Sequence, residues 1–451
     1  MALSFLRGAV VAALLLAFGV PSIADAATMN VSRRVDPSLD RYLLTAGPQT
    51  SAAEMTAEQK WLAANASPLV LHDSDPRVSQ YITGWAIKAR TAVYRNGTGV
   101  NRWNTAGMNE TQAWRMTQNG QPVAVDTDWQ TIDLRIPAAR RWWLYGADGK
   151  VSCNPDANER GALDLYACGY SSLWIDNALT NPKVGFSPAM QISAKRWANG
   201  VLTLLKSLKK LKPKGTTFTI NMHWTDTKYG YAAKPKLKAS DPAVRAARLA
   251  DQVIIEGGAI DPGLHYPLAA TVAWSYRRLL TFADALHQRK AKVQWEMTSS
   301  ADLTKSQTPV AGAPLLAALP ACGDADQASG TWALGDLVWQ AHTRAAAFNF
   351  ATAVLTFKSG DSVGDTCQYP GRGWAGYSAN LGKPVGKRVD RRGLLTRKLK
   401  HGIVVLNPND VSKRVKLPKA GVNLASTTWP QPTVKVKSLT LGPRSAAVVQ
   451  Y

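Results

Sequence analysis

The chain has 451 residues, of which 45% are hydrophobic and 19% are charged. This composition excludes an intrinsically disordered protein, and the length allows a large core domain together with a smaller appended one. Lys and Arg total 54 against 31 Asp and Glu, which gives a formal net charge of +23 and makes polyanions possible partners.

The N-terminal residues 1–26 have the pattern of a secretory signal peptide. Arg7 gives a positive start, residues 8–20 form an apolar run, and a small-x-small cleavage site ends at Ala26. The run is too short to span a bilayer, and no later stretch of the sequence is long and apolar enough to do so. We therefore expect a secreted or periplasmic protein that begins with an N-terminal extension over residues 27–64.

Cysteine use agrees with export. The four cysteines allow three pairings, and their order suggests Cys153–Cys168 and Cys322–Cys367. A zinc site would need closer, paired spacing such as C-x2-C, which is absent. Structural disulfides in an oxidising compartment are therefore predicted.

Short apolar runs alternate with amphipathic segments over residues 65–390. The runs predicted as strands are residues 69–75, 123–127, 171–177, 217–224, 250–258, 292–300 and 351–357. The helices predicted between them include residues 136–147, 188–211 and 269–290. Apolar strands separated by helices are typical of a parallel sheet that is buried on both faces. The absence of G-x-G-x-x-G and G-x4-G-K-[ST] weakens the case for a nucleotide-binding open sheet, which leaves a (β/α)8 TIM barrel as the predicted catalytic domain.

After residue 390 the pattern changes. HGIVVLNPND, KRVKLP and TVKVKSLTLGPRSAAVVQY alternate apolar and polar residues, with turn residues between them. This alternation predicts antiparallel strands with one solvated face. The predicted fold class is therefore α/β, a (β/α)8 TIM barrel followed by a small C-terminal antiparallel β-sandwich over residues 391–451.

Polar or aromatic residues lie near the ends of several predicted strands. In a (β/α)8 barrel these ends converge on one face, where active sites lie. The residues in question are Asp73, Asp176, Asn177, Asn221, His223, Trp224, Glu256, Trp295 and Glu296. Asp73 also suits a helix start because Pro76 follows, and Asp176 alone could be a helix cap. Glu256 is a poor turn former, and the glycines after it would let a substrate approach the backbone.

These residues favour hydrolysis of glycosidic bonds, which needs one protonated acid and one ionised carboxylate. We predict Asp176 and Glu256 for these roles and the other seven residues as substrate-binding. The six histidines are scattered and G-x-S-x-G is missing, so neither a metal site nor a serine hydrolase is predicted, and no cofactor is expected. Sixteen Trp fit stacking on sugar faces, although most will be core; Trp174 is assigned to the core.

SSLWIDNA, at residues 171–178, resembles the "DG-x-FLDN" strand-four motif of a family of secreted TIM-barrel glycoside hydrolases that is distantly similar to the polygalactosaminidases. AWRMTQNGQPV and TIDLRIPAARRWWL are similar to its strand-three region, TFTINMHW to strand five and VIIEGG to strand six. NLGKPVGKRVDRRGLLTRKLKHGIVVLNPND is similar to its junction with a C-terminal β domain. The resemblance runs from about residue 65 to the end and implies that Asp176 is the nucleophile or base and Glu256 the acid. Ser171-Ser172 replace the usual DG at the entrance of the strand, not at its catalytic end.

The sequence thus predicts a monomeric glycoside hydrolase whose partner is a polysaccharide, with no membrane span and no nucleic acid. Basic clusters at residues 206–215, 234–238 and 387–400 favour an acidic polysaccharide or an anionic envelope surface, or serve solubility alone. Two alternatives remain open: a non-catalytic glycan-binding protein on the same scaffold, which would not need both acids, and a nucleic-acid binder, which would gather the basic clusters on one face.

Overall fold

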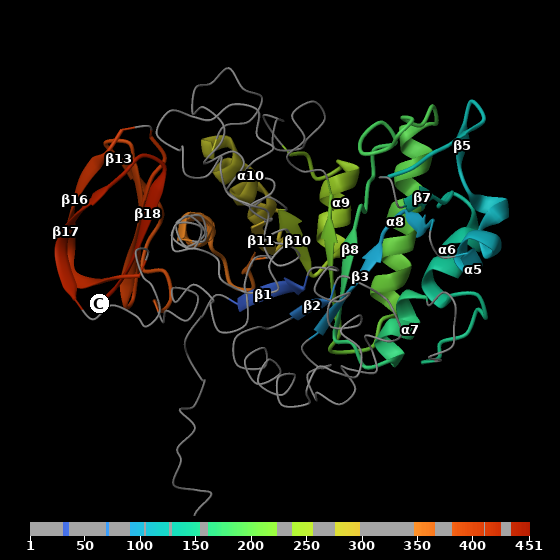
Figure 1. Ribbon diagram of the computed structural model, residues 1–451, viewed down its shortest axis with the longest axis horizontal. Helices are drawn as coiled ribbons and strands as arrows, with labels where there is room; N and C mark the ends of the chain where they lie inside the picture. The colour runs from blue at the N-terminus through green and yellow to red at the C-terminus, as the bar shows by residue number, and fades with distance from the viewer. Residues whose placement is uncertain are drawn as a thin grey trace, which may run out of the picture.

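The computed structural model describes twelve stretches of the chain in enough detail for analysis, and they form two parts (Figure 1). The stretches are residues 30–35, 69–71, 91–102, 105–125, 129–153, 161–222, 237–255, 276–297, 347–365, 381–409, 411–424 and 434–451. The larger part is an α/β barrel, and the smaller part is an antiparallel sheet made by the C-terminal residues.

Eight parallel strands form the barrel. They are β1 (Asn30–Val35), β2 (Leu69–Leu71), β3 (Thr91–Asn96), β8 (Ser172–Asp176), β9 (Thr217–Asn221), β10 (Gln252–Ile255), β11 (Val293–Met297) and β12 (Ser362–Asp365). The strands pair in the order β1-β12-β11-β10-β9-β8-β3-β2, and β1 also pairs with β2, so that the ring closes. Because every pair is parallel, all eight carboxyl ends lie on one face of the barrel. The predicted parallel α/β core is confirmed.

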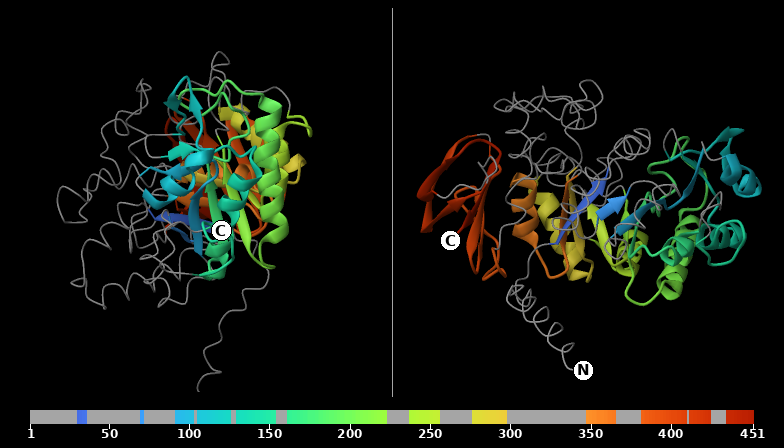
Figure 2. Two further views of the ribbon diagram at one scale, coloured as in Figure 1. Left: turned by 90° about the vertical axis from the view of Figure 1, so that its right-hand side faces the viewer. Right: turned by 60° about the horizontal axis from the view of Figure 1, so that its bottom comes forward.

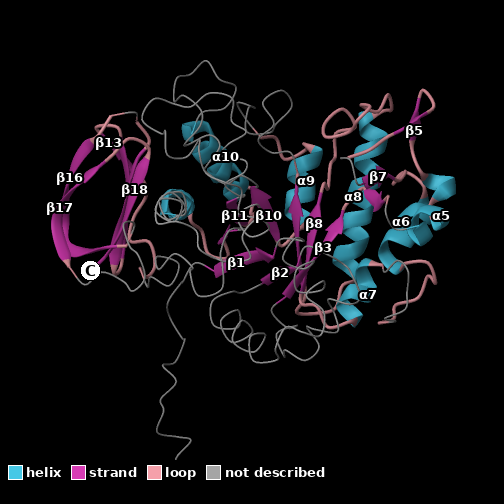
Figure 3. Ribbon diagram, viewed as in Figure 1, coloured by secondary structure: helices cyan, strands magenta, loops and turns pink. Residues whose placement is uncertain are grey.

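Helices pack around these strands (Figure 3). The described ones are α6 (Pro137–Tyr145), α7 (Ala162–Ala167), α8 (Ala194–Leu211), α9 (Pro242–Leu249), α10 (Tyr276–Gln288) and a helical stretch at residues 347–356. In α8 the Ser193 hydroxyl accepts a hydrogen bond from the Arg196 N–H and caps the first turn. The apolar face of α8 is buried, as the amphipathic pattern predicts, and includes Trp197, Val201 and Leu205.

A small insertion separates β3 from β8. Its elements are β4 (Gly99–Asn101), α5 (Thr105–Glu110), η3 (Gln112–Trp114), β5 (Thr117–Gln118), β6 (Gln121–Pro122) and β7 (Trp129–Thr131), followed by α6 and α7. β4 pairs with β7 and β5 with β6, both antiparallel. The insertion starts where β3 ends, so β4 and β7 lie near the carboxyl end of that strand.

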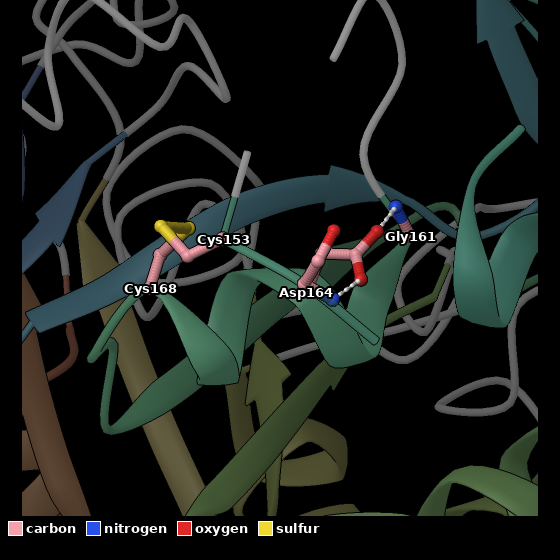
Figure 4. The surroundings of a disulfide bond; sticks show 5 residues. Cys153, Gly161, Asp164 and Cys168 are labelled. Atoms are coloured by element: carbon pink, nitrogen blue, oxygen red, sulfur yellow. Dashed lines mark hydrogen bonds between the residues drawn. A yellow bond between two sulfur atoms is a disulfide. The ribbon is translucent and has the colours of Figure 1, made fainter. Parts of the chain in front are cut away.

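A disulfide fixes the end of this insertion ahead of β8 (Figure 4). Cys153 and Cys168 are bonded with their Cα atoms 4.8 Å apart, which confirms the first predicted pair, whereas Cys322 and Cys367 lie outside the described residues. Within the closed loop, the Asp164 carboxylate accepts hydrogen bonds from the backbone N–H groups of Ser152 (2.9 Å) and Gly161 (2.7 Å). Burial raises the pKa of Asp164 and these hydrogen bonds oppose that rise.

The structure corrects several predicted elements. Residues 351–357, predicted as a strand, belong to the helix of residues 347–356, and the barrel strand β12 follows that helix. This segment is buried on all sides, so apolar periodicity does not distinguish helix from strand. Of the stretch predicted as a strand at residues 123–127, the described residues 123–125 form isolated bridges at Ala124 and no longer strand. The barrel strand β3 was not predicted, and β1 falls in the expected N-terminal extension, so the barrel begins before residue 65.

The C-terminal part is one six-stranded antiparallel sheet in the order β13-β14-β15-β18-β16-β17. Its strands are β13 (Val389–Arg391), β14 (Leu394–Leu399), β15 (Gly402–Asn407), β16 (Lys413–Asn423), β17 (Lys435–Leu441) and β18 (Ser445–Gln450). The predicted antiparallel domain is confirmed, but its strands join in one continuous sheet and not in the two separate sheets of a sandwich. The domain also begins at or before residue 389, slightly ahead of the predicted residue 391.

The two faces of this sheet pack differently. Val404 and Val448 belong to the large core that includes the barrel residues, whereas Val405 and Val449 form a second core with Val415 and other residues of β16 and β17. One face of β15 and β18 therefore packs toward the barrel, and β16 and β17 cover the other face.

Arg397 joins the two parts of the molecule. It lies on β14, and its Nη1 donates hydrogen bonds to the carbonyl oxygens of Val354 (2.9 Å), Leu355 (3.3 Å) and Phe357 (3.0 Å). A cation at these carbonyls complements the negative end of the helix dipole, and burial lowers the pKa of Arg397. The right-hand view of Figure 2 shows this helix, in orange, between the C-terminal sheet and the barrel strands.

Candidate active site at the carboxyl end of the barrel

Alternate residues of the barrel strands face the interior. Tyr94, Trp174 and Ile254, from β3, β8 and β10, form a small cluster with Trp129 packed against it, separate from the main core. The Tyr94 ring lies 5.5 Å from Trp174 and 5.7 Å from Trp129, centroid to centroid. Because side chains alternate along a strand, Asp176 faces the same way as Trp174 and lies one layer closer to the carboxyl end.

Asp176 is held by donors from three neighbouring strands or strand ends. Its Oδ2 accepts hydrogen bonds from the Tyr94 hydroxyl (3.1 Å) and from Asn177 Nδ2 (3.1 Å). Its Oδ1 accepts hydrogen bonds from Asn221 Nδ2 (2.9 Å) and from the Asn177 backbone N–H (2.8 Å). An ionised carboxylate only accepts hydrogen bonds, so a shell of donors fits the charged form. Asp176 is half-buried, so the site holds its orientation while leaving it accessible.

The backbone around Asp176 fixes this geometry. Asn177 has φ +52°, the left-handed conformation that Asn tolerates better than most residues and that turns the chain sharply at the end of β8. The Gly97 N–H donates to the Asp176 carbonyl oxygen at 2.6 Å, and the Ala178 N–H donates to the Asn221 carbonyl oxygen at 2.9 Å. A Cβ at residue 97 would lie 2.8 Å from the Asp176 carbonyl oxygen, so only glycine fits this close approach.

Asn96 ends β3 beside Asp176 and has a different role. It pairs with Asp176 in the β3–β8 register, and its side chain is buried. Its Oδ1 accepts hydrogen bonds from the backbone N–H groups of Thr98 (3.0 Å) and Gly99 (2.8 Å). Asn96 therefore organises the turn that leads into the insertion.

The structure brings together three of the predicted site residues: Asp176, Asn177 and Asn221. Trp295 is fully buried with Val293 in the main core, on the outer side of the barrel strands, so the prediction that it lies in the substrate site is wrong. Glu296 follows it in β11, where its backbone pairs with Gly364. The predicted residues Asp73, His223, Trp224 and Glu256 lie outside the described residues. Trp174 lies in the core, as predicted.

Sequence reasoning missed Tyr94 and Trp129. Tyr94 contacts Asp176 through its hydroxyl, and Trp129 packs against Tyr94 with its ring tilted by 49°. The signal was present in TAVYRN, a β-branched and aromatic run at residues 91–96 with an Asn at its end. Its central Arg95 obscured the pattern. Arg95 is buried on the outer side of β3, 4.9 Å from the Trp143 ring centroid, and donates to the Trp143 carbonyl oxygen.

The described stretches also lack two other kinds of feature. Within them, no three His, Cys, Asp or Glu side chains gather in a way that could hold a metal ion. No helix there combines the length and the apolar character needed to cross a membrane.

Among known proteins, the chain is similar to solved structures of low sequence identity. No protein-family model matches the chain, and no curated protein matches it. Among solved structures it is similar to a maltogenic alpha-amylase, AmyB, from Thermotoga neapolitana, with a TM-score of 0.45, 9% identity, and coverage of 94% of this chain and 98% of that one. A pullulanase from Bacillus acidopullulyticus gives a TM-score of 0.48 at 10% identity, covering 94% of this chain and 61% of that one. An isomaltulose synthase mutant from Erwinia rhapontici NX5 gives 0.44 at 10% identity, covering 93% and 98%.

Proposed function

We propose that this protein is a glycoside hydrolase that cleaves O-glycosidic bonds in an extracellular or cell-envelope polysaccharide. The observation that carries the proposal is the position of Asp176. It ends a barrel strand on the face where barrel enzymes place their chemistry, it is accessible, and donors from three neighbouring strands or strand ends orient it. A residue that only formed a turn would not need its carboxylate to be oriented in this way, whereas a carboxylate that acts on a substrate would.

Asp176 takes the role of nucleophile or base in this proposal. The Tyr94 hydroxyl, the Asn221 amide and two N–H groups of Asn177 donate hydrogen bonds to its carboxylate, which fits a carboxylate that stays ionised while a second group supplies the proton. We assign the acid role to Glu256, which follows β10 directly in the sequence. Parallel strands present their ends on the same face, so the chain leaves β10 on the face where Asp176 ends β8.

Two aromatic side chains support a carbohydrate substrate. Trp129 is half-buried at the edge of the interior cluster and packs against Tyr94, which contacts Asp176. A partly exposed indole next to a catalytic carboxylate offers a flat apolar surface to a sugar ring. The signal peptide pattern at residues 1–26 supports a substrate outside the cytoplasm.

The test is hydrolysis of a panel of bacterial exopolysaccharides, neutral and uronic-acid-containing, measured by release of reducing ends. Asp176→Asn and Glu256→Gln each keep the side-chain size and remove the carboxylate. We expect each to lower kcat by on the order of 10²–10⁴-fold, while circular dichroism and thermal unfolding stay close to wild type. The matched control is Asp284→Asn, which removes a surface carboxylate of α10 and should leave kcat unchanged.

Full activity in either site variant would contradict the assignment of that carboxylate. If the wild-type protein binds a glycan of the panel but releases no reducing ends from any of them, the non-catalytic glycan-binding alternative is favoured instead.

A further inference from the structure

The outer layer of the C-terminal sheet carries a uniform positive charge. From residue 411 to residue 451 the sequence holds seven Lys and Arg and no Asp or Glu. Arg444 is buried, and the other six lie on β16 and β17. They are Lys413, Arg414, Lys416, Lys419, Lys435 and Lys437. We call Arg414, Lys416, Lys435 and Lys437, all exposed, the basic stripe.

The basic stripe faces away from the barrel. On β16, Val415 and Leu417 are buried in the second core of the sheet, so the residues that alternate with them point outward. The strands β15 and β18 lie beneath this core, and their opposite faces pack toward the barrel. Figure 1 shows β16 and β17 at the end of the molecule that is farthest from β8. The stripe is therefore separate from the site around Asp176.

Hydroxyl groups line up beside these cations. In the β16–β17 register Arg414 lies opposite Thr440 and Lys416 opposite Ser438, and both hydroxyl residues are exposed. Lys437 and Lys435 lie further along β17, on either side of Val436, whose side chain packs against the second core, and both are exposed. The five steps of strand between Thr440 and Lys435 span roughly 17 Å at the usual rise per residue. The row is thus long enough to follow an extended polymer.

We propose that the basic stripe is a non-catalytic binding site for an anionic polysaccharide. Ammonium and guanidinium groups pair with carboxylate or sulfate groups, and Ser and Thr hydroxyls can bond sugar hydroxyls. The choice of a polysaccharide over other polyanions rests on the proposed function. By binding its polymer on the C-terminal domain, the protein would raise the local concentration of glycosidic bonds near Asp176.

The composition of the stripe argues against two other anionic partners. Membrane-surface binding buries Trp, Phe or Leu beside the cations, and single-stranded nucleic acid stacks its bases on aromatic rings. Among the described residues of β16 and β17 no aromatic side chain is exposed, and the exposed large apolar residues nearby are Val411 and Val434, just outside the two strands. Lysines on β17, an edge strand, can also prevent pairing between sheet edges; that role alone predicts no polymer binding.

The experiment measures binding of the full chain to polygalacturonate, by affinity electrophoresis and by calorimetry at several salt concentrations. In the test variant Arg414, Lys416, Lys435 and Lys437 are all changed to Gln. The matched control changes three exposed lysines and one exposed arginine near α8 and α9 to Gln, namely Lys206, Lys210, Lys214 and Arg245. We expect the test variant to lose on the order of tenfold or more in affinity and most of its salt dependence, and the control to lose little.

Equal loss in both variants would show that net charge alone drives binding and would overturn the proposal. So would absence of polygalacturonate binding by the wild type, or tighter binding of phosphatidylglycerol vesicles or duplex DNA at equal salt. Asp176→Asn should bind as the wild type does. If the wild type binds through the stripe yet hydrolyses nothing, the binding site stands and the hydrolase proposal fails. If the wild type hydrolyses polymers and the test variant binds them normally, the hydrolase proposal stands and the binding site on the basic stripe fails.

Discussion

Asp176 and Asp361 occupy opposite ends of the barrel, and their surroundings contrast. Asp176 ends β8 and is half-buried, with hydrogen bonds from Tyr94, Asn177 and Asn221. Asp361 immediately precedes β12 at the amino end, and its Oδ2 lies 2.9 Å from His287 Nε2. Its oxygens also accept hydrogen bonds from the backbone N–H groups at residues 293 and 358, both at 2.8 Å.

Hydrogen bonds orient both carboxylates, so the difference between them is their access to solvent. The side chains of His287 and Asp361 are 3% and 0% exposed, so no substrate reaches them. Their contacts join α10, β11 and β12 and stabilise the fold. At the carboxyl end the same kind of residue is oriented but left accessible. The buried pair therefore stabilises the amino end of the barrel, whereas the accessible carboxylate at the carboxyl end is the one to which we assign chemistry in our proposal, in line with the usual position of active sites in this architecture.

The strongest test of the amino end is Asp361→Ala. The substitution leaves His287 buried without its carboxylate and two backbone N–H groups without their acceptor. We expect a loss of about 3–5 kcal/mol in the free energy of unfolding, measured by urea denaturation. The protein that remains folded should keep the wild-type kcat, in contrast to Asp176→Asn.

Asp284→Ala is the control for Asp361→Ala. Asp284 pairs with Arg388 at 2.7 Å but is 40% exposed, so its loss should cost about 1 kcal/mol or less. A cost for Asp361→Ala as small as that of Asp284→Ala would show that the buried pair contributes little to stability. A large loss of kcat in folded Asp361→Ala would break the division between the two ends.

Removal of the disulfide is expected to lower the free energy of unfolding somewhat less than Asp361→Ala does. Cys153 and Cys168 are 15 residues apart, and Cys168 lies just ahead of the amino end of β8. Replacing both with Ser should cost about 3 kcal/mol in unfolding free energy, because the closed loop restricts the unfolded chain. Chemical denaturation measures this loss, and kcat at a temperature where the variant is folded should not change. A variant that is as stable as the wild type would contradict the expectation.

The sequence was informative where a strand is apolar and followed by a polar residue. β2, β8, β9, β10 and β11 were predicted within a few residues, and they are five of the eight barrel strands. β1 and β3 were missed because Arg33, Arg34 and Arg95 interrupt them, so neither reads as an apolar run. For β3 the reason is visible in space: Arg95 is buried against Trp142 and Trp143 of α6, a pairing that no local pattern encodes.

In the candidate site, too, local sequence patterns predicted strand ends but not the contacts between distant segments. Asp176, Asn177 and Asn221 could be predicted because each lies at or just after the end of a predicted strand. Trp295 was assigned to the wrong face of β11. It faces outward with Val293, and neighbouring residues of a strand face opposite sides, so an error of one position reverses the face. Tyr94 was missed because its contact with Asp176 spans 82 residues of sequence, and only the closed sheet brings the two together.

Tyr94 therefore gives the subtlest test of the carboxyl end. Tyr94→Phe keeps the ring that stacks on Trp174 and packs against Trp129, and it removes only the hydroxyl that donates to Asp176. A hydrogen bond to a charged group contributes about 1.5–3 kcal/mol, so we expect kcat to fall on the order of tenfold and thermal stability to change little. Tyr145→Phe, in α6, is the matched control and should leave both unchanged.

The pH dependence separates a positioning role from a merely structural one. Without the Tyr94 hydroxyl the ionised form of Asp176 loses one donor, so the acid limb of the kcat/KM profile should move to higher pH. A structural defect would lower activity at every pH and leave the limb in place. An unchanged limb with reduced kcat would mean that Tyr94 supports the barrel interior and does not tune the carboxylate. The contrast between the two ends would then rest on the hydrogen bonds from Asn177 and Asn221.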